Sequence, residues 1–434
     1  MKNQVITRAL THNKGLFILW AVIATFGAYF CTYAFRKPYT TGTFEGFFFG
    51  KMEYKTIIII AQVIGYMLSK FLGIKIISEL KAKQRILLII SLILIALLSL
   101  TLFAFIPAPY NIIFMFMNGL PLGMVWGVIF SFLEGRRLTE LLGMALSVNM
   151  IITSGILKST YLFIQTNFAF SDFEMPLVMG CTFFPFFLLS VWMLSKLPPP
   201  TQAEKNSKMS RKAMTKTEKR KVWQELFPGL SLLIISYALF TTLRDFRDNF
   251  AVEIWHNLDA KIDISVFART ESLIGIIVMS LIALLVLIKS NRIAYRFINL
   301  AMIVSLFGLL LSTILFKQGQ LSPFNWLVSQ GISFYLPYLL IQIAFFERLI
   351  PILKIKSNAG YFVYLCDSVG YLGSVLLLFY KEFLATNLNY AQLLISFSYI
   401  TATVGLALII GQYFFFSYLL NQKNKVSDLV QTSN

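Results

Sequence analysis

Charged residues are scarce in this sequence, and histidines are scarcer still. Of its 434 residues 13% are charged, 57% are hydrophobic, and only His12 and His256 are histidines. A soluble domain is typically about 25% charged, so the composition excludes a soluble globular protein and predicts an integral membrane protein. Because both histidines lie outside the apolar runs, a histidine metal site or proton relay within the membrane is also excluded.

Cysteine pairs and catalytic motifs are missing as well. The three cysteines, Cys31, Cys181 and Cys366, fall inside apolar runs, where a free thiol behaves as a small buried hydrophobe. The chain carries no phosphate-binding P-loop, no His-Glu-x-x-His, no Gly-x-Ser-x-Gly turn and no paired cysteine ligands. We therefore expect no enzyme activity, no coupling to ATP, no bound metal and no cofactor.

Long apolar runs fill most of the chain. A membrane-spanning helix needs about 20 residues, and the runs near this length lie at approximately 15–36, 56–77, 85–106, 110–133, 141–165, 175–196, 227–252, 265–288, 293–316, 325–347, 358–380 and 390–420. We predict an all-α integral membrane fold with twelve transmembrane helices in two pseudo-symmetric six-helix bundles, 1–200 and 226–434. A basic cytoplasmic linker at 201–225 joins them.

The positions of the basic residues explain the net charge of +18. Lys and Arg gather in alternate connections, and eight of them lie between Lys205 and Lys221. The positive-inside rule places these connections and both termini in the cytoplasm. We therefore expect a multi-pass protein of the bacterial inner membrane, acting as a monomer. Its expected partners are the lipid bilayer and a small anionic substrate, and no nucleic acid.

Two arginines inside apolar runs are the most informative charges. Arginine at the centre of a membrane helix costs about 2.5–3.5 kcal/mol on insertion scales, so it marks a functional-site candidate. Arg36 lies near the end of the first run, and Arg244 follows 208 residues later, close to half the chain length, as an internal duplication requires. Tyr29 and Tyr237 each precede their arginine by seven residues and so share its helical face. We predict that Arg36 and Arg244 converge on one anionic substrate.

Two carboxylates lie in the same spans as candidate partners. Asp248 follows Arg244 by four residues on the same helical face, where an ion pair lowers the cost of burial. Asp367 is expected near the membrane midplane. It can pair with Arg244 or Arg247, or it can contact the substrate directly.

Tyrosines and lysines inside the spans each keep two interpretations. Lys70 and Lys158 can face a cavity, or they can extend to the membrane interface. The tyrosines can supply hydroxyl donors and a flat wall for a substrate, or they can pack helices; these are Tyr29, Tyr33 and Tyr237.

Small residues and proline predict local backbone features. Gly119, Gly123 and Gly127 recur at four-residue spacing in the fourth run, and Gly65 lies in the second. Such residues allow close helix approach in membranes. Pro38 directly after Arg36 and Lys37 should kink or fray the first helix.

The excess of cations favours a phosphorylated ligand. Guanidinium groups bind phosphate oxygens through paired hydrogen bonds. A phosphate ester carries about −1.5 to −2 charge, so two arginines approximately neutralise it. Sulfate and carboxylate would fit less specifically.

Four motifs resemble those of the organophosphate:phosphate antiporters of the major facilitator superfamily, the glycerol-3-phosphate and hexose-phosphate transporters. They are Tyr33-Ala-Phe-Arg36-Lys37, Ser69-Lys70-Phe71, Leu243-Arg244 followed by an acidic residue about a turn later, and Ala359-Gly360 with Gly370-Tyr371-Leu372-Gly373-Ser374-Val375. Together these motifs span most of the chain. The resemblance implies that Arg36 and Arg244 hold a phosphoryl group on the pseudo-two-fold axis.

The resemblance also implies two ion pairs that form and break as the halves rock. Lys37 would pair with an acidic residue of the seventh helix, with Asp248 preferred, and Lys70 would pair with Glu271. The chain departs from that family's pattern in its fifth helix, which lacks the histidine and has Ser147, Asn149 and Ile151 nearby. Lys158 and Asp367 are additional charges.

The leading functional hypothesis is a secondary transporter that moves an anionic, phosphorylated metabolite by alternating access, with inorganic phosphate as counter-substrate. One alternative is a proton-coupled carboxylate transporter with Asp367 as the proton site. Another is a membrane sensor that binds a sugar phosphate without transporting it. A lipid-processing enzyme is disfavoured because no nucleophile and base are arranged together.

Overall fold

The computed structural model describes residues 2–78, 82–133, 139–199, 216–258, 263–353 and 359–432, together with residues 80, 355 and 357. The first part of the predicted linker, up to residue 215, lies outside the described residues. Within them, ten helices are long and apolar enough to cross a membrane.

These ten spans agree closely with the apolar runs of the sequence. They are α2 (Lys14–Arg36), α4 (Arg85–Phe105), α5 (Ile112–Leu133), α7 (Met175–Ser195), α9 (Lys216–Asn249), α11 (Val266–Val286), α12 (Asn291–Lys317), α13 (Pro323–Leu340) continued by η3 (Ile341–Phe345) and α14 (Phe346–Leu353), α15 (Ala359–Phe383) and α16 (Tyr390–Thr432). Helices α3 (Tyr54–Ser78) and α6 (Thr139–Phe168) complete the twelve. The predicted all-α, multi-pass membrane fold is confirmed.

The shorter elements lie outside these spans. They are α1 (Lys2–His12), η1 (Pro38–Thr40), β1 (Phe48–Phe49), β2 (Met52–Glu53), η2 (Ala82–Gln84) and α10 (Ala251–Asn257). Strands β1 and β2 form an antiparallel hairpin that pairs Phe48 with Glu53 and Phe49 with Met52. The sequence analysis predicted neither the hairpin nor α10.

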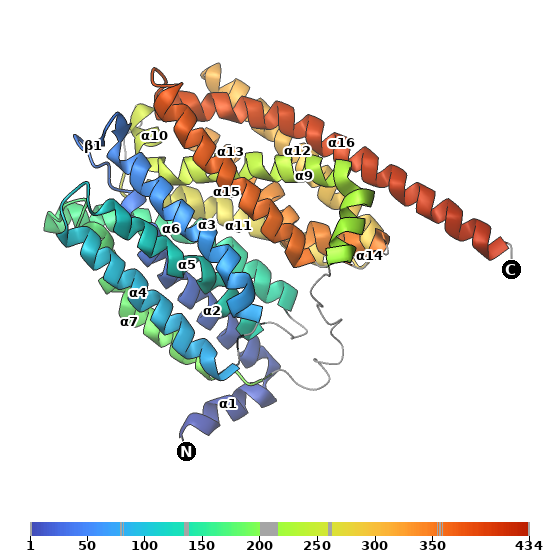
Figure 1. Cartoon of the computed structure of the whole chain (residues 1–434), viewed down its shortest axis with the longest axis horizontal. Coiled ribbons are helices and arrows are strands. Elements are labelled where there is room, and N and C mark those ends of the chain that lie inside the picture. Colours follow the sequence, from blue (N-terminus) through green and yellow to red (C-terminus); the bar gives the residue numbers. More distant parts are fainter. Residues whose placement is uncertain are drawn as a thin grey trace. The chain divides into compact units, whose positions relative to one another are not determined.

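The chain packs as two compact units (Figure 1). The first comprises the described residues before 200, Asp248–Gly275 and Glu382–Ala385. The second comprises 216–247, Ile276–Lys381 and the described residues from Thr386 onward. Helix α9 therefore passes from one unit to the other between Arg247 and Asp248.

Close backbone contact defines the packing of the first unit. A Cβ atom at Gly65 would lie 2.3 Å from the Phe116 carbonyl oxygen, and one at Gly119 would lie 2.3 Å from the Gln62 carbonyl oxygen. A Cβ atom at Gly123 would meet the carbonyl oxygen of the α3 residue Tyr66 at 2.6 Å. Only glycine allows α3 and α5 to approach so closely, which confirms the predicted packing role of these glycines.

The second unit uses the same device between α9 and α15. A Cβ atom at Gly370 would lie 2.8 Å from the Thr241 side chain, and one at Gly373 would lie 2.6 Å from Thr242 Oγ1. Elsewhere in this unit α12 packs against α13 and α16. The Gly-Tyr-Leu-Gly motif of α15 thus holds that helix directly against the arginine-bearing α9.

The end of α2 is a tight turn. The backbone N–H of Lys37 donates to the Tyr33 carbonyl at 2.9 Å, and Pro38 then begins the buried turn η1. The helix stops before Pro38, and this turn takes the place of the kinked or frayed end that the proline predicts.

Candidate functional site

Side-chain amides from two helices hold the end of α2 in the first unit. The last carbonyl groups of a helix have no partner within the helix. Asn118 Nδ2 donates to the Phe35 carbonyl at 3.1 Å, and Gln62 Nε2 donates to the Arg36 carbonyl at 2.7 Å. Gln62 also donates to Asn118 Oδ1 at 2.8 Å and accepts from the Tyr39 hydroxyl at 2.9 Å. The backbone that carries Arg36 is therefore fixed by α3 and α5.

Arg36 lies among aromatic rings. Its Cζ atom is 3.8 Å from the ring centroid of Tyr66 and 5.8 Å from that of Tyr33. Tyr33 in turn meets Tyr29 edge-on, with centroids 5.2 Å apart, and both tyrosines are 5% exposed. A guanidinium group on an aromatic face gains a cation–π interaction. The predicted residues Tyr29, Tyr33 and Arg36 thus lie together, and Tyr66 joins them.

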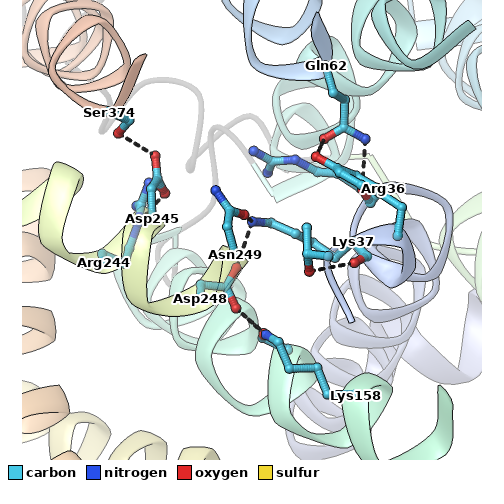
Figure 2. A network of polar contacts seen from close by, with 12 residues as sticks. Arg36, Lys37, Gln62, Lys158, Arg244, Asp245, Asp248, Asn249 and Ser374 are labelled. Atoms are coloured by element: carbon cyan, nitrogen blue, oxygen red, sulfur yellow. Dashed lines mark hydrogen bonds and ion pairs between the residues drawn. The ribbon is translucent and has the colours of Figure 1, made fainter. Parts of the chain in front are cut away.

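Asp248 joins two lysines in the first unit (Figure 2). Its Oδ2 atom is 2.6 Å from Lys37 Nζ, and its Oδ1 atom is 2.5 Å from Lys158 Nζ. Ser154 also donates a hydrogen bond to Asp248, and Lys37 donates to Asn249 Oδ1 at 2.7 Å. The pairing of Lys37 and Asp248 is the one that the family resemblance implies. Lys158 is 4% exposed and bound to Asp248, so it does not extend to the membrane interface.

Three of the four charged side chains gathered here are cationic. We define the cationic cluster as Arg36, Lys37, Lys158 and Asp248, which contribute three positive charges and one negative charge. All four side chains lie within membrane-spanning helices or at their ends, and they are largely buried. Ionisable groups inside membrane spans are costly to bury and mark candidate functional sites. The cationic cluster brings three cationic side chains to the site, which suits it to bind an anion.

A second cluster surrounds Arg244 in the second unit. Arg244 donates to Asp245 Oδ1 through Nε at 3.0 Å and through Nη2 at 2.7 Å. Ser374 on α15 donates to Asp245 Oδ2 at 2.8 Å, as Figure 2 shows. The Arg244 Cζ atom also lies 4.3 Å from the ring centroid of Tyr338. The carboxylate bound to Arg244 here is thus that of the adjacent residue, whereas the sequence offered Asp248 and Asp367 as its candidate partners.

Tyr237 and Asp367 form the other half of this second cluster. The Tyr237 hydroxyl donates to Asp367 Oδ1 at 2.5 Å, and the rings of Tyr237 and Tyr338 lie 5.0 Å apart. Tyr237 is fully buried and Asp367 is 5% exposed. The structure therefore gives Asp367 a tyrosine partner, where the sequence analysis offered an arginine or the substrate.

The remaining predicted residues occupy separate positions. Arg247 is buried over Phe334, and its Nη2 donates to the Leu327 carbonyl at 3.4 Å. Lys70 Nζ lies 5.4 Å from the Tyr66 ring centroid. Glu271 packs on α6, because a Cβ atom at Gly155 would lie 2.6 Å from the Cβ atom of Glu271.

Two predicted pairings stay predictions. The first is the pairing of Lys70 with Glu271. The second is the convergence of Arg36, in the first unit, with Arg244, in the second.

Within the described residues, no group of three or more His, Cys, Asp or Glu side chains could hold a metal ion.

Sequence reasoning missed several residues of both clusters. Gln62, Asn118 and Tyr66 were unassigned, although two amides within apolar runs are themselves a signal, since polar groups inside a membrane need partners. Asp245 was not predicted as a partner of Arg244 because neighbours along a helix do not normally face each other. Ser374 was not predicted because its contact depends on how α15 packs on α9.

Solved structures of similar fold are membrane transporters. A D-xylose–proton symporter matches with a TM-score of 0.60 and 12% identity, covering 91% of this chain and 97% of its own. The nucleoside transporter NupG matches with a TM-score of 0.59 and 14% identity, covering 92% of this chain and 98% of its own. A third match is the major facilitator superfamily proton:xylose symporter XylE bound to 6-bromo-6-deoxy-D-glucose. Its TM-score is 0.60 and its identity 13%, and the match covers 93% of this chain and 96% of its own.

The chain therefore has the fold of the major facilitator superfamily. It belongs to the family of unknown function DUF5690, whose profile matches residues 38–418. No curated protein matches it in sequence.

Proposed function

We propose that the protein is a secondary transporter that moves an anionic, phosphorylated small metabolite by alternating access and takes inorganic phosphate as a counter-substrate. The observation that carries this proposal is the cationic cluster, in which the buried Lys37 and Lys158 share the carboxylate of Asp248 and the buried Arg36 directly precedes Lys37. The major facilitator fold supports transport as the use of such a site.

The chemistry of the cluster favours a phosphoryl group. A phosphate ester carries about −1.5 to −2 charge at neutral pH and offers three acceptor oxygens. The cationic cluster offers three cationic groups to such a ligand. Guanidinium and ammonium groups both donate strong hydrogen bonds to phosphate oxygens. The rings of Tyr29, Tyr33 and Tyr66 next to Arg36 supply a wall for the organic part.

Charge balance also gives a reason for exchange. Closing a site around uncompensated cations buries charge at a cost of several kcal/mol, and a bound anion removes this cost. We propose that Arg244 contributes to the same anion from the second unit. Lys37 and Asp248 would then separate and rejoin during the cycle.

The test is uptake of radiolabelled phosphate and phosphate esters into proteoliposomes loaded with phosphate. Hydrogen bonds to charged groups contribute about 1.5–3 kcal/mol, so Arg36→Ala should reduce uptake by about tenfold to a hundredfold. The matched control is Arg269→Ala. The Arg269 side chain is 68% exposed, and its ion pair with Asp263 is long, with Nη1 and Oδ2 3.9 Å apart. Undiminished uptake in Arg36→Ala would refute the assignment. Phosphate binding without flux would instead indicate a sensor.

A second candidate is a proton-coupled carboxylate transporter. The buried hydrogen bond between Tyr237 and Asp367 favours it, because a carboxylate inside a membrane protein is a common proton carrier. Two of the similar structures are those of proton:xylose symporters. Uptake driven by a pH gradient without internal phosphate, and lost in Asp367→Asn, would favour this candidate over exchange.

A further inference from the structure

The contact between Arg244 and Asp245 has an unusual geometry for a helix. Residues i and i+1 project about 100° apart and do not normally face each other. Here both the Nε and Nη2 atoms of Arg244 nevertheless converge on Asp245 Oδ1, at 3.0 and 2.7 Å. The pair is buried, with both residues 7% exposed. Something outside α9 must therefore hold Asp245 in this position.

Helix α15 supplies that hold. The Ser374 hydroxyl donates to Asp245 Oδ2 at 2.8 Å. Ser374 can reach Asp245 because Gly370 and Gly373 let α15 approach α9 closely, as the short contacts to Thr241 and Thr242 require. The carboxylate is thus bound at both oxygens, one to the guanidinium and one to a hydroxyl.

We propose that Asp245 is an internal competitor for the anion site at Arg244 and determines which anions can bind there. This inference rests on the proposed function, in which Arg244 binds the substrate anion. Asp245 occupies the Nε and Nη2 edge of the guanidinium, and an incoming anion that binds this edge must displace it.

Displacement discriminates between anions by their charge. A substrate monocarboxylate offers Arg244 the same group that Asp245 already provides, so the exchange gains nothing. A phosphoryl group offers about −1.5 to −2 charge and three acceptor oxygens, so it competes successfully. Asp245 therefore excludes monocarboxylates and admits phosphate esters. If Asp245 only compensated a buried charge, its removal would alter stability and leave this selectivity unchanged.

The test measures binding of radiolabelled inorganic phosphate to the purified full-length protein, with lactate as competitor. In the wild type, lactate should compete at least about a hundredfold more weakly than unlabelled phosphate. In Asp245→Asn, phosphate should bind several-fold more tightly and the advantage over lactate should fall by about tenfold. Asp263→Asn, an exposed carboxylate changed in the same way, should match the wild type.

Ser374→Ala keeps the inference testable if Asp245→Asn does not fold. Without the Ser374 hydroxyl, Asp245 loses the contact that holds it against Arg244. The changes in phosphate affinity and in the advantage over lactate should therefore have the same direction as in Asp245→Asn and be smaller. Unchanged affinity and selectivity in folded variants would overturn the inference while leaving the proposed function intact, and so would loss of phosphate binding in Asp245→Asn alone. Absence of phosphate binding in the folded wild type would overturn both.

Discussion

Replacing Asp248 should expose the energetic cost of the cationic cluster. Asp248→Asn keeps the shape of the side chain but removes the only negative charge of that cluster. Lys37 and Lys158 would then lie near each other without the carboxylate that now contacts both, at 2.6 and 2.5 Å. The asparagine oxygen can still accept one hydrogen bond, so the loss is mainly electrostatic.

The magnitude follows from burial. The side chains of Lys37, Lys158 and Asp248 are 10%, 5% and 12% exposed, so solvent screens them weakly. Removing one partner of a buried ion pair costs about 3–5 kcal/mol. Removing a lysine from the variant should recover part of that cost, since residues in one ionic network couple by about 0.5–3 kcal/mol. We therefore expect Asp248→Asn with Lys158→Met to be more stable than Asp248→Asn alone.

The assay is a double-mutant cycle on thermal stability in detergent. The four proteins are the wild type, Asp248→Asn, Lys158→Met and the double variant. A parallel cycle on Arg269 and Asp263, whose side chains are 68% and 64% exposed, should show coupling below about 1 kcal/mol. Additive effects of Asp248→Asn and Lys158→Met would refute the electrostatic reasoning, because independent sites do not rescue each other.

Two further predictions concern packing and loop structure. Gly119→Ala should destabilise the protein by about 1–3 kcal/mol through overpacking and reduce uptake by displacing Gln62. Gly308→Ala should be tolerated, because a Cβ atom there would meet only Ser333, at 3.4 Å, so equal melting temperatures of the two variants would contradict this prediction. Asp172→Ala should cost about 2–3 kcal/mol in thermal unfolding, because the carboxylate accepts four hydrogen bonds, from Thr43 N, Phe44 N, Tyr161 and Gln165; a wild-type melting temperature would show that these donors find other partners.

Hydropathy predicted the twelve helices because a membrane demands a continuous apolar run from each span. The spans that carry Arg36, Arg244 and Asp367 could be recognised in this way, and the apolar run at 141–165 corresponds to α6, which carries Lys158. The same rule identified the charges as candidates, since ionisable groups inside spans are costly. It could not assign their partners, because partners come from other helices.

The partner of Arg244 illustrates this limit. Within one helix the i, i+4 rule selects Asp248, but Asp248 contacts Lys37 and Lys158. Arg244 contacts Asp245, which Ser374 of α15 holds in place. That choice depends on how closely α15 packs on α9, and spacing along one helix contains no information about it. A closer interpretation of the Gly-Tyr-Leu-Gly-Ser motif as a packing surface followed by a hydroxyl would have indicated the contact.

The two clusters differ in charge, and this difference bears on what each contributes to binding. In the first unit Lys37 and Lys158 share one carboxylate, Asp248, whereas in the second unit Arg244 is matched one to one by Asp245. Under the proposed function, the lysine pair therefore attracts an anion without first losing its own carboxylate. Arg244 adds no net charge until Asp245 is displaced, so its contribution depends on how well the anion competes.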